Sequence, residues 1–71
     1  MSDNRIKKLG EIARQTRKKQ GLTQEQLAAA TGVGVRFIRE LERGKESCHI
    51  GKALLVVSML GIDVVVDGET L

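Results

Sequence analysis

The sequence has few of the residues that small proteins use for cross-links or for chemistry. It contains one cysteine, which excludes an intrachain disulfide, and Cys48 with His49 are too few for a four-ligand metal site. It has no proline, tryptophan or tyrosine, and one aromatic residue, Phe37, does not make a stacking platform for single-stranded nucleic acid. No set of nucleophile, base and orienting group can be assembled. We therefore expect no enzyme and no cofactor, and we expect Cys48 and His49 to be bystanders near a helix start.

Long apolar runs and targeting signals are also missing. The longest apolar run covers residues 53–57, far less than a membrane span, and the first residues lack the apolar region of a signal peptide. We therefore expect a cytoplasmic protein. At 71 residues, the chain is one small domain that buries only about 60–65% of its unfolded surface. A second copy of the chain could supply the stability that so thin a core lacks.

Positive charge is concentrated in the first two-thirds of the chain. The whole sequence has 12 Lys and Arg against 9 Asp and Glu, a formal charge of +3. All of the basic residues lie between residues 5 and 52, whereas residues 53–71 contain three acids and no base. This asymmetry is compatible with an anionic partner for the first part and with a different role for the apolar, acidic tail.

Hydrophobic spacing predicts four helices, each ending at a glycine. The expected helices cover residues 5–19, 23–32, about 35–43 and about 49–60. Thr23 to Gln26 fits a capping box, and Ser47 is the predicted cap of the fourth helix. The fourth helix is apolar nearly all round, which predicts that it is buried on more than one side.

Residues 62–66 are rich in β-branched side chains and are followed by Asp67-Gly68, which predicts a short strand. Since no second strand is expected in the chain, we predict that this strand pairs antiparallel with its own copy across a two-fold axis. The alternative is a frayed tail. The residues predicted to form the dimer interface are Leu55, Val56, Met59, Ile62, Val64 and Val66.

Residues 24–43 are predicted to form two short helices joined by a tight turn. Ala28 is small where the second helix crosses the first, and Gly32 suits the left-handed turn between them. The residues expected to close the corner against the preceding helix are Val33, Ile38 and Leu41. This arrangement is a helix-turn-helix, whose second helix enters the major groove of DNA.

The sequence resembles the Cro/repressor helix-turn-helix family of the xenobiotic-response-element type. The resemblance covers most of the chain and rests on residues 21–28, 31–33 and 38–45. It implies an all-α, lambda-repressor-like bundle of four to five helices, with one short C-terminal strand pairing across a homodimer. Residues 1–61 would form the DNA-binding domain, and residues 62–71 a strand and tail for dimerisation.

Residues 35–42, together with the terminal strand, are more narrowly similar to the HipB-type antitoxins. That resemblance implies a bacterial, nucleoid-associated autorepressor that binds double-stranded DNA as a homodimer on an inverted-repeat operator. It also implies a HipA-like kinase toxin as a further partner. Two other interpretations stay open: a stand-alone phage-type repressor, and a protein-interaction subunit that mainly neutralises a toxin.

The family resemblance also assigns roles to individual residues. The positions implied to contact DNA are Gln24, Val35, Arg36, Arg39, Glu40, Arg43 and Lys45. Gln24, Arg43 and Lys45 would hold phosphates, Val35 and Arg36 would contact base edges, and Arg39 suits either role. For Glu40 two interpretations are equally good: it accepts a hydrogen bond from cytosine, or it pairs with Arg36 four residues earlier.

Four further positions bear on the stability and placement of the second motif helix. Arg17 and Glu42 hold the positions of a partly buried ion pair between the first and third helices. Gly34 stands where the family usually has a polar cap, which removes one side-chain contact to phosphate. Phe37 replaces a usual small hydroxyl residue and is expected to pack beside Leu41.

Overall fold

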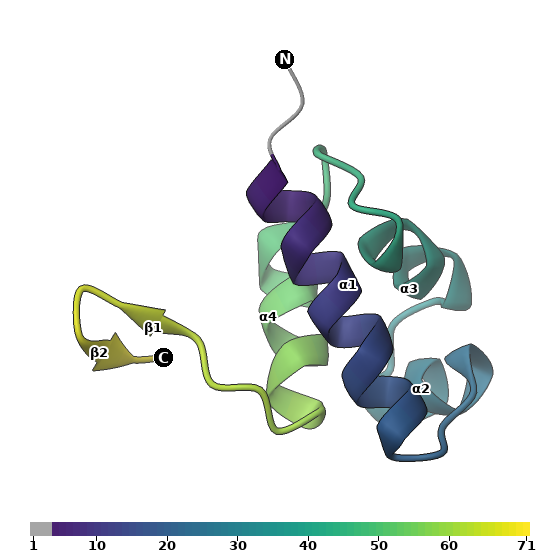
Figure 1. The fold of residues 1–71 in the computed structure, drawn as a ribbon. Helices are drawn as coiled ribbons and strands as arrows, with labels where there is room; N and C mark the ends of the chain where they lie inside the picture. The colour runs from purple at the N-terminus through teal and green to yellow at the C-terminus, as the bar shows by residue number, and fades with distance from the viewer. Residues whose placement is uncertain (1–3) are drawn as a thin grey trace.

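Four helices form the body of the protein in the computed structural model, which describes residues 4–71 (Figure 1). The elements are α1 (Asn4–Lys19), α2 (Gln24–Thr31), α3 (Val35–Glu42), α4 (Ile50–Met59), β1 (Val65–Val66) and β2 (Glu69–Thr70). The predicted helical bundle is thereby confirmed, with four helices among the described residues. None of these helices is long and apolar enough to cross a bilayer. Residues 1–3, for which no signal peptide is predicted, lie outside the described part of the chain.

The core lies where the four helices meet. α3 packs against α1 and α2, and α2 packs against α4. Every helix contributes to the buried cluster, whose members are Ala13, Leu27, Ala28, Val33, Ile38, Leu41, Ala53, Val56 and Leu60. Phe37 packs against this cluster as expected. Burial of a side chain such as Ile38 or Leu41 contributes about 1.5–3 kcal/mol, so the corner of the helix-turn-helix is held mainly by apolar contacts.

Two glycines bring α1 and α3 into close contact. A Cβ on Gly10 would lie 2.2 Å from the carbonyl oxygen of Leu41. Gly44 follows α3 with a φ of +76°, and a Cβ there would lie 2.7 Å from the Cα of Lys7. In both cases the obstacle is backbone, which cannot rotate away, so a larger residue would force the two helices apart. Hydrophobic periodicity does not reveal the role of Gly10, because glycine has no side chain to contribute to the pattern.

Both ends of α2 carry the expected caps. The Thr23 hydroxyl accepts a hydrogen bond from the backbone N–H of Gln26 at 3.0 Å, and the Gln26 side chain accepts one from the N–H of Thr23 at 2.8 Å. Gly32 ends the helix with a φ of +78°, in the left-handed region that favours glycine. These caps fix the turn that leads into α3.

The cap of α4 differs from the prediction. The residue before the helix is His49, whose Nδ1 accepts a hydrogen bond from the backbone N–H of Lys52 at 3.3 Å. Ser47 lies two residues further from the helix, so the predicted Ser47 cap is wrong. His49 is therefore part of the helix start and not a bystander.

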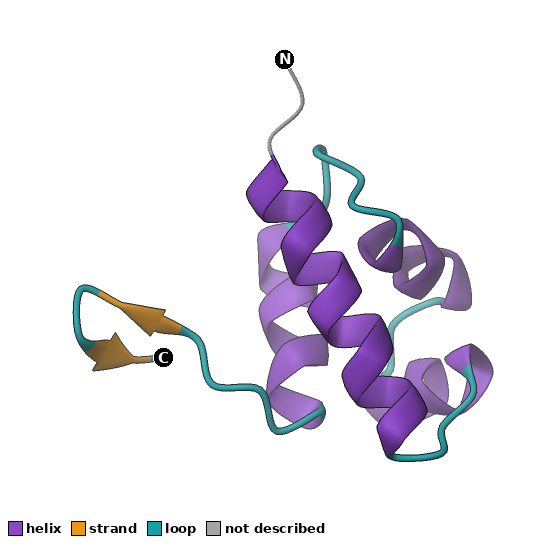
Figure 2. Ribbon diagram, viewed as in Figure 1, coloured by secondary structure: helices purple, strands orange, loops and turns teal. Residues whose placement is uncertain are grey.

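The C-terminal strand pairs within its own chain, and Figure 2 shows the resulting hairpin standing apart from the helices. β1 and β2 are antiparallel, with Val66 opposite Glu69. Asp67 and Gly68 both have positive φ, +50° and +81°, the geometry of a tight two-residue hairpin turn. The prediction of a strand over residues 62–66 without an intrachain partner is therefore wrong in length and in pairing, because this turn folds the chain back on itself.

α4 is buried on one face and exposed on another. Its fully covered residues are Ala53, Val56 and Val57. Ile50, at the start of the helix, is 68% exposed, and on the side away from the core Leu55 is 44% and Met59 51% exposed. Burial of α4 on more than one side is therefore not achieved within one chain. Val56 is also removed from the predicted dimer interface, because a side chain that is 0% exposed offers no surface to a partner.

Candidate nucleic-acid interface

α3 has one buried and one exposed face. Its buried residues are Ile38, Leu41 and Glu42. Arg36 and Arg39 lie on the opposite face, and the side chain of Arg36 is 88% exposed. Arg43 caps the helix and is also exposed. Since residues three or four apart lie on one side of a helix, these three arginines form a row along the outer side of α3.

Glu40 lies between two basic side chains of this face. Its carboxylate accepts a hydrogen bond from Nζ of Lys45, and Oε1 is 3.7 Å from Nε of Arg36. The hydrogen bond from Lys45 lowers the pKa of Glu40, and the charge of Arg36 adds to the effect. Of the two predicted roles for Glu40, the structure shows the pairing with Arg36. An exposed ion pair contributes little to stability, so Arg36 can leave Glu40 for another partner.

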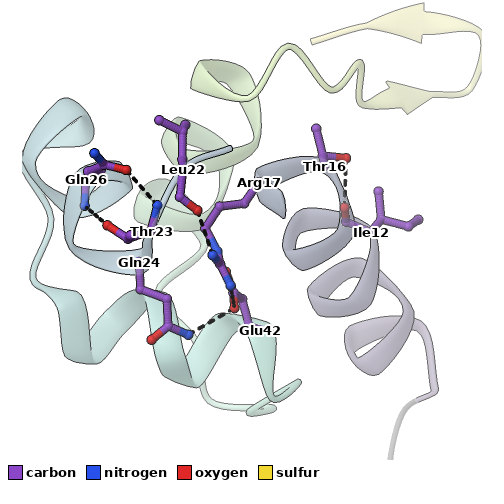
Figure 3. A network of polar contacts seen from close by, with 8 residues as sticks. All are labelled: Ile12, Thr16, Arg17, Leu22, Thr23, Gln24, Gln26 and Glu42. Atoms are coloured by element: carbon purple, nitrogen blue, oxygen red, sulfur yellow. Dashed lines mark hydrogen bonds and ion pairs between the residues drawn. The ribbon is translucent and has the colours of Figure 1, made fainter. Parts of the chain in front are cut away.

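A buried ion pair fastens α3 to α1 (Figure 3). Nε and Nη2 of Arg17 donate to the two carboxylate oxygens of Glu42 at 2.6 and 3.0 Å. Nη1 of Arg17 also donates to the carbonyl oxygen of Leu22 at 2.8 Å. Nε2 of Gln24 donates to Oε1 of Glu42 at 3.0 Å. One carboxylate on α3 therefore holds α1 and the start of α2 as well.

Both members of this pair are charged at neutral pH. Burial raises the pKa of Glu42, but the hydrogen bonds from Arg17 and Gln24 outweigh burial and hold that pKa below its ordinary value. The hydrogen bond to Glu42 raises the pKa of Arg17. The structure thus places the two predicted residues in a structural contact that sets the position of α3.

Two of the residues predicted to contact DNA are turned partly inward. Gln24, the first residue of α2, is half-buried and uses one amide N–H to hold Glu42. Val35, the first residue of α3, is half-buried and packs against the core. Gly34 caps α3 without a side-chain hydrogen bond, because it has no side chain. The phosphate role of Gln24 and the base contact of Val35 stay predictions.

A hollow opens between α1, α2 and α3, next to the row of arginines. Its lining residues are Glu11, Arg14, Gln24, Arg39, Glu42 and Arg43. The sequence predicts no role for Arg14, since its place at this hollow depends on how closely α1 crosses α3. Among residues 4–71, no three His, Cys, Asp or Glu side chains come together to hold a metal ion. The groups that this hollow offers for binding a ligand are therefore mainly the guanidinium groups of its arginines.

Two short helices meet in a buried corner, and the second carries a row of basic residues on its exposed side. This arrangement defines the helix-turn-helix class of proteins. A family model described as "Helix-turn-helix" matches residues 14–66, and the protein belongs to that family. The chain is also 48% identical over 63 residues to an uncharacterized HTH-type transcriptional regulator, y4mF, of Sinorhizobium fredii. That match covers 86% of this chain and 83% of the relative. The predicted helix-turn-helix resemblance is thereby confirmed, and the narrower similarity to HipB-type antitoxins stays a prediction.

Proposed function

We propose that this protein is a transcriptional repressor that binds double-stranded DNA sequence-specifically by placing α3 in the major groove. The observation that carries the proposal is the exposed row of Arg36, Arg39 and Arg43 on a helix held in place by buried contacts. Membership of the helix-turn-helix family and the naming of its Sinorhizobium relative as a transcriptional regulator support it.

The side chains of this face suit different parts of DNA. A guanidinium group can donate two hydrogen bonds to O6 and N7 of guanine, which makes Arg36 the main candidate for contact with bases. Arg43 and Lys45, which follow the end of α3, would contact the phosphates that fix the position of the helix. The operator sequence would then be selected by α3, and most of the affinity would come from charge.

We further infer a homodimer from the apolar surface formed by α4 and the hairpin. An isolated two-stranded hairpin is marginally stable in water, yet Val65 and Val66 are 58% and 54% exposed here. An apolar groove also runs between α4 and the C-terminal segment, lined by Leu54, Leu55, Ile62, Val64 and Leu71 among others. A second copy across a two-fold axis would cover this surface. The hairpin, as part of the proposed dimerisation segment 62–71, could then pair with its copy edge to edge.

Such a dimer would present two copies of α3 to successive major grooves about 34 Å apart. Selection of DNA from a random pool is therefore expected to recover an inverted repeat, with half-sites about one helical turn apart. Sequencing of the bound fraction gives the measurement. Recovery of unrelated sequences at the same yield would show that the protein does not recognise an operator.

The dimer interface can be tested at Val66. Val66→Asp is expected to shift the protein from dimer to monomer and to weaken operator binding, because it places a charge in an apolar contact. Sedimentation velocity gives the molecular mass. Ser47→Asp is the matched control for the sedimentation measurement, since it adds the same charge to an exposed polar position that lies outside the hairpin and does not line the groove. A Val66→Asp variant that sediments like the wild type would exclude this interface.

A second candidate function is that of an antitoxin in a HipBA-like toxin–antitoxin system. The similarity of residues 35–42 to HipB-type antitoxins favours it, and Ile50, 68% exposed and outside the groove, offers apolar surface for a protein partner. Co-expression with the product of the neighbouring gene tests this role. A stable complex with a HipA-like kinase supports it, and operator binding without any complex favours a stand-alone repressor.

A further inference from the structure

Three arginines have no ion pair with another residue among residues 4–71, and all three line the same hollow. They are Arg14 of α1, Arg39 of α3 and Arg43 at the end of α3. By contrast, Arg17 and Arg36 each pair with a glutamate. Gathering like charges without counter-ions is unfavourable unless water or an anion compensates them. An anion bound in the hollow would therefore reduce the electrostatic repulsion between these three arginines.

The two carboxylates in the lining do not cancel this charge. Glu42 is already neutralised by the bidentate contact with Arg17. Glu11 is exposed and accepts a hydrogen bond from Nε2 of Gln15 at 2.9 Å. Three guanidinium groups thus face one uncompensated carboxylate.

The donors of the hollow suit a phosphate in particular. Guanidinium groups present pairs of N–H donors in a flat fork, which matches two oxygens of a phosphate. Gln24 adds an amide group whose first N–H is held by Glu42 and whose second is not used in any described hydrogen bond. Arg14 lies close enough to Glu42 that its positive charge helps to lower the pKa of that carboxyl. The donors therefore come from three helices whose positions the core fixes.

We propose that this hollow binds one phosphate of the DNA backbone and that Arg14 on α1 is a DNA-contacting residue. The inference rests on the proposed function and extends it, since it assigns a DNA contact to a helix outside the helix-turn-helix pair. Arg39 and Arg43 belong both to the hollow and to the exposed row on α3. A strand whose bases face α3 would thus carry its phosphates past the hollow.

The test is the salt dependence of operator binding by Arg14→Ala. Each phosphate contact contributes about 0.9 to the slope of log affinity against log salt concentration. In a dimer the variant should lose two contacts, so the slope should become shallower by about 2. Affinity should fall on all DNA sequences alike, because phosphates carry no base information.

Lys8→Ala is the matched control, since it removes one positive charge from an exposed position of α1 that does not line the hollow. Thermal unfolding of both variants verifies that they fold. If Arg14→Ala has the slope and affinity of Lys8→Ala, the assignment of Arg14 to a phosphate is overturned while the proposed function stands.

If the wild type binds no DNA, the proposed function fails and the DNA part of this inference fails with it. An NMR titration of the wild type with inorganic phosphate then decides about the site itself. Selective shifts of the side-chain Nε–H signals of Arg14, Arg39 and Arg43 would support a site for free phosphate. Equal small shifts of all arginines would overturn the site.

Discussion

Replacement of Arg17 by alanine is expected to lower the free energy of unfolding by about 3–5 kcal/mol. The variant leaves the Glu42 carboxylate buried without the two hydrogen bonds that neutralise it, with a side chain only 4% exposed. A domain of this size rarely has more than about 3–5 kcal/mol of stability from its core, so much of the variant should be unfolded at room temperature. Urea denaturation followed by circular dichroism gives the measurement.

The pH dependence of the free energy of unfolding shows whether the unpaired Glu42 carboxylate causes the loss of stability in Arg17→Ala. The folded-state pKa of Glu42 is lowered in the wild type, so its contribution is present above the ordinary pKa of about 4.5 and is lost as the pH falls through the folded value. In Arg17→Ala the buried carboxyl should have a raised pKa and gain stability by taking up a proton. The difference in stability between wild type and variant should therefore begin to shrink above pH 4.5, where the variant takes up its proton, and should go on shrinking below pH 4.5 as the wild type loses its contribution.

Two further variants test whether the loss of stability in Arg17→Ala comes from the buried charge of Glu42. Lys18→Ala, at the exposed neighbouring position, should change stability by less than about 0.5 kcal/mol. The double variant Arg17→Met/Glu42→Leu should be more stable than Arg17→Ala, because it removes the buried charge together with its partner. A difference between wild type and Arg17→Ala that stays constant down to pH 3 would contradict the role given to Glu42.

Replacement of Arg36 by alanine is expected to weaken operator binding by about 1–3 kcal/mol per half-site and to relax the preference at one base pair in each. The side chain is 88% exposed and held only by an ion pair with Glu40 on its own helix, so its removal should leave the fold intact. In a dimer the loss applies twice. Competition binding with operators changed at single positions measures both the affinity and the selectivity.

Lys8→Ala again serves as the control for loss of charge, and it should leave the base preference unchanged. Arg36→Lys should also relax the preference, because a lysine lacks the fork that donates to both O6 and N7 of guanine. Undiminished selectivity in Arg36→Ala would assign the reading of bases to other residues of α3.

Most of the fold can be predicted from the sequence because its helices have clear signals at their ends. The capping box of Thr23 and Gln26 and the left-handed Gly32 lie where local chemistry places them. The hairpin is harder, since two-residue strands have no periodicity. The Asp67-Gly68 pair is typical of a hairpin turn, but only three residues follow it.

The packing of α4 could not be predicted for a different reason. Its apolar residues occur nearly all round the helix, so the pattern does not indicate which side faces the core. Val56 is fully buried, whereas Leu55 and Met59 are about half exposed. Only the positions of the other helices decide between these residues.

The candidate site is predictable where it lies on one helix and not where several helices meet. The spacing of Arg36, Arg39 and Arg43 on one helical side is evident from the sequence. The approach of Arg14 to two of them depends on the crossing of α1 and α3. That crossing is fixed by Gly10, which no hydrophobic pattern marks.

The close backbone approach at Gly10 and Gly44 keeps α1 and α3 together. In the proposed dimer, the separation and relative angle of the two DNA-reading surfaces would therefore depend on the segment from α4 to the C-terminus. In such a dimer α3 would select the bases of each half-site. The segment from α4 to the C-terminus would set the number of base pairs between the two half-sites. Changes confined to the C-terminal stretch could then redirect such a regulator to promoters with another spacer length while its base preference is inherited unchanged.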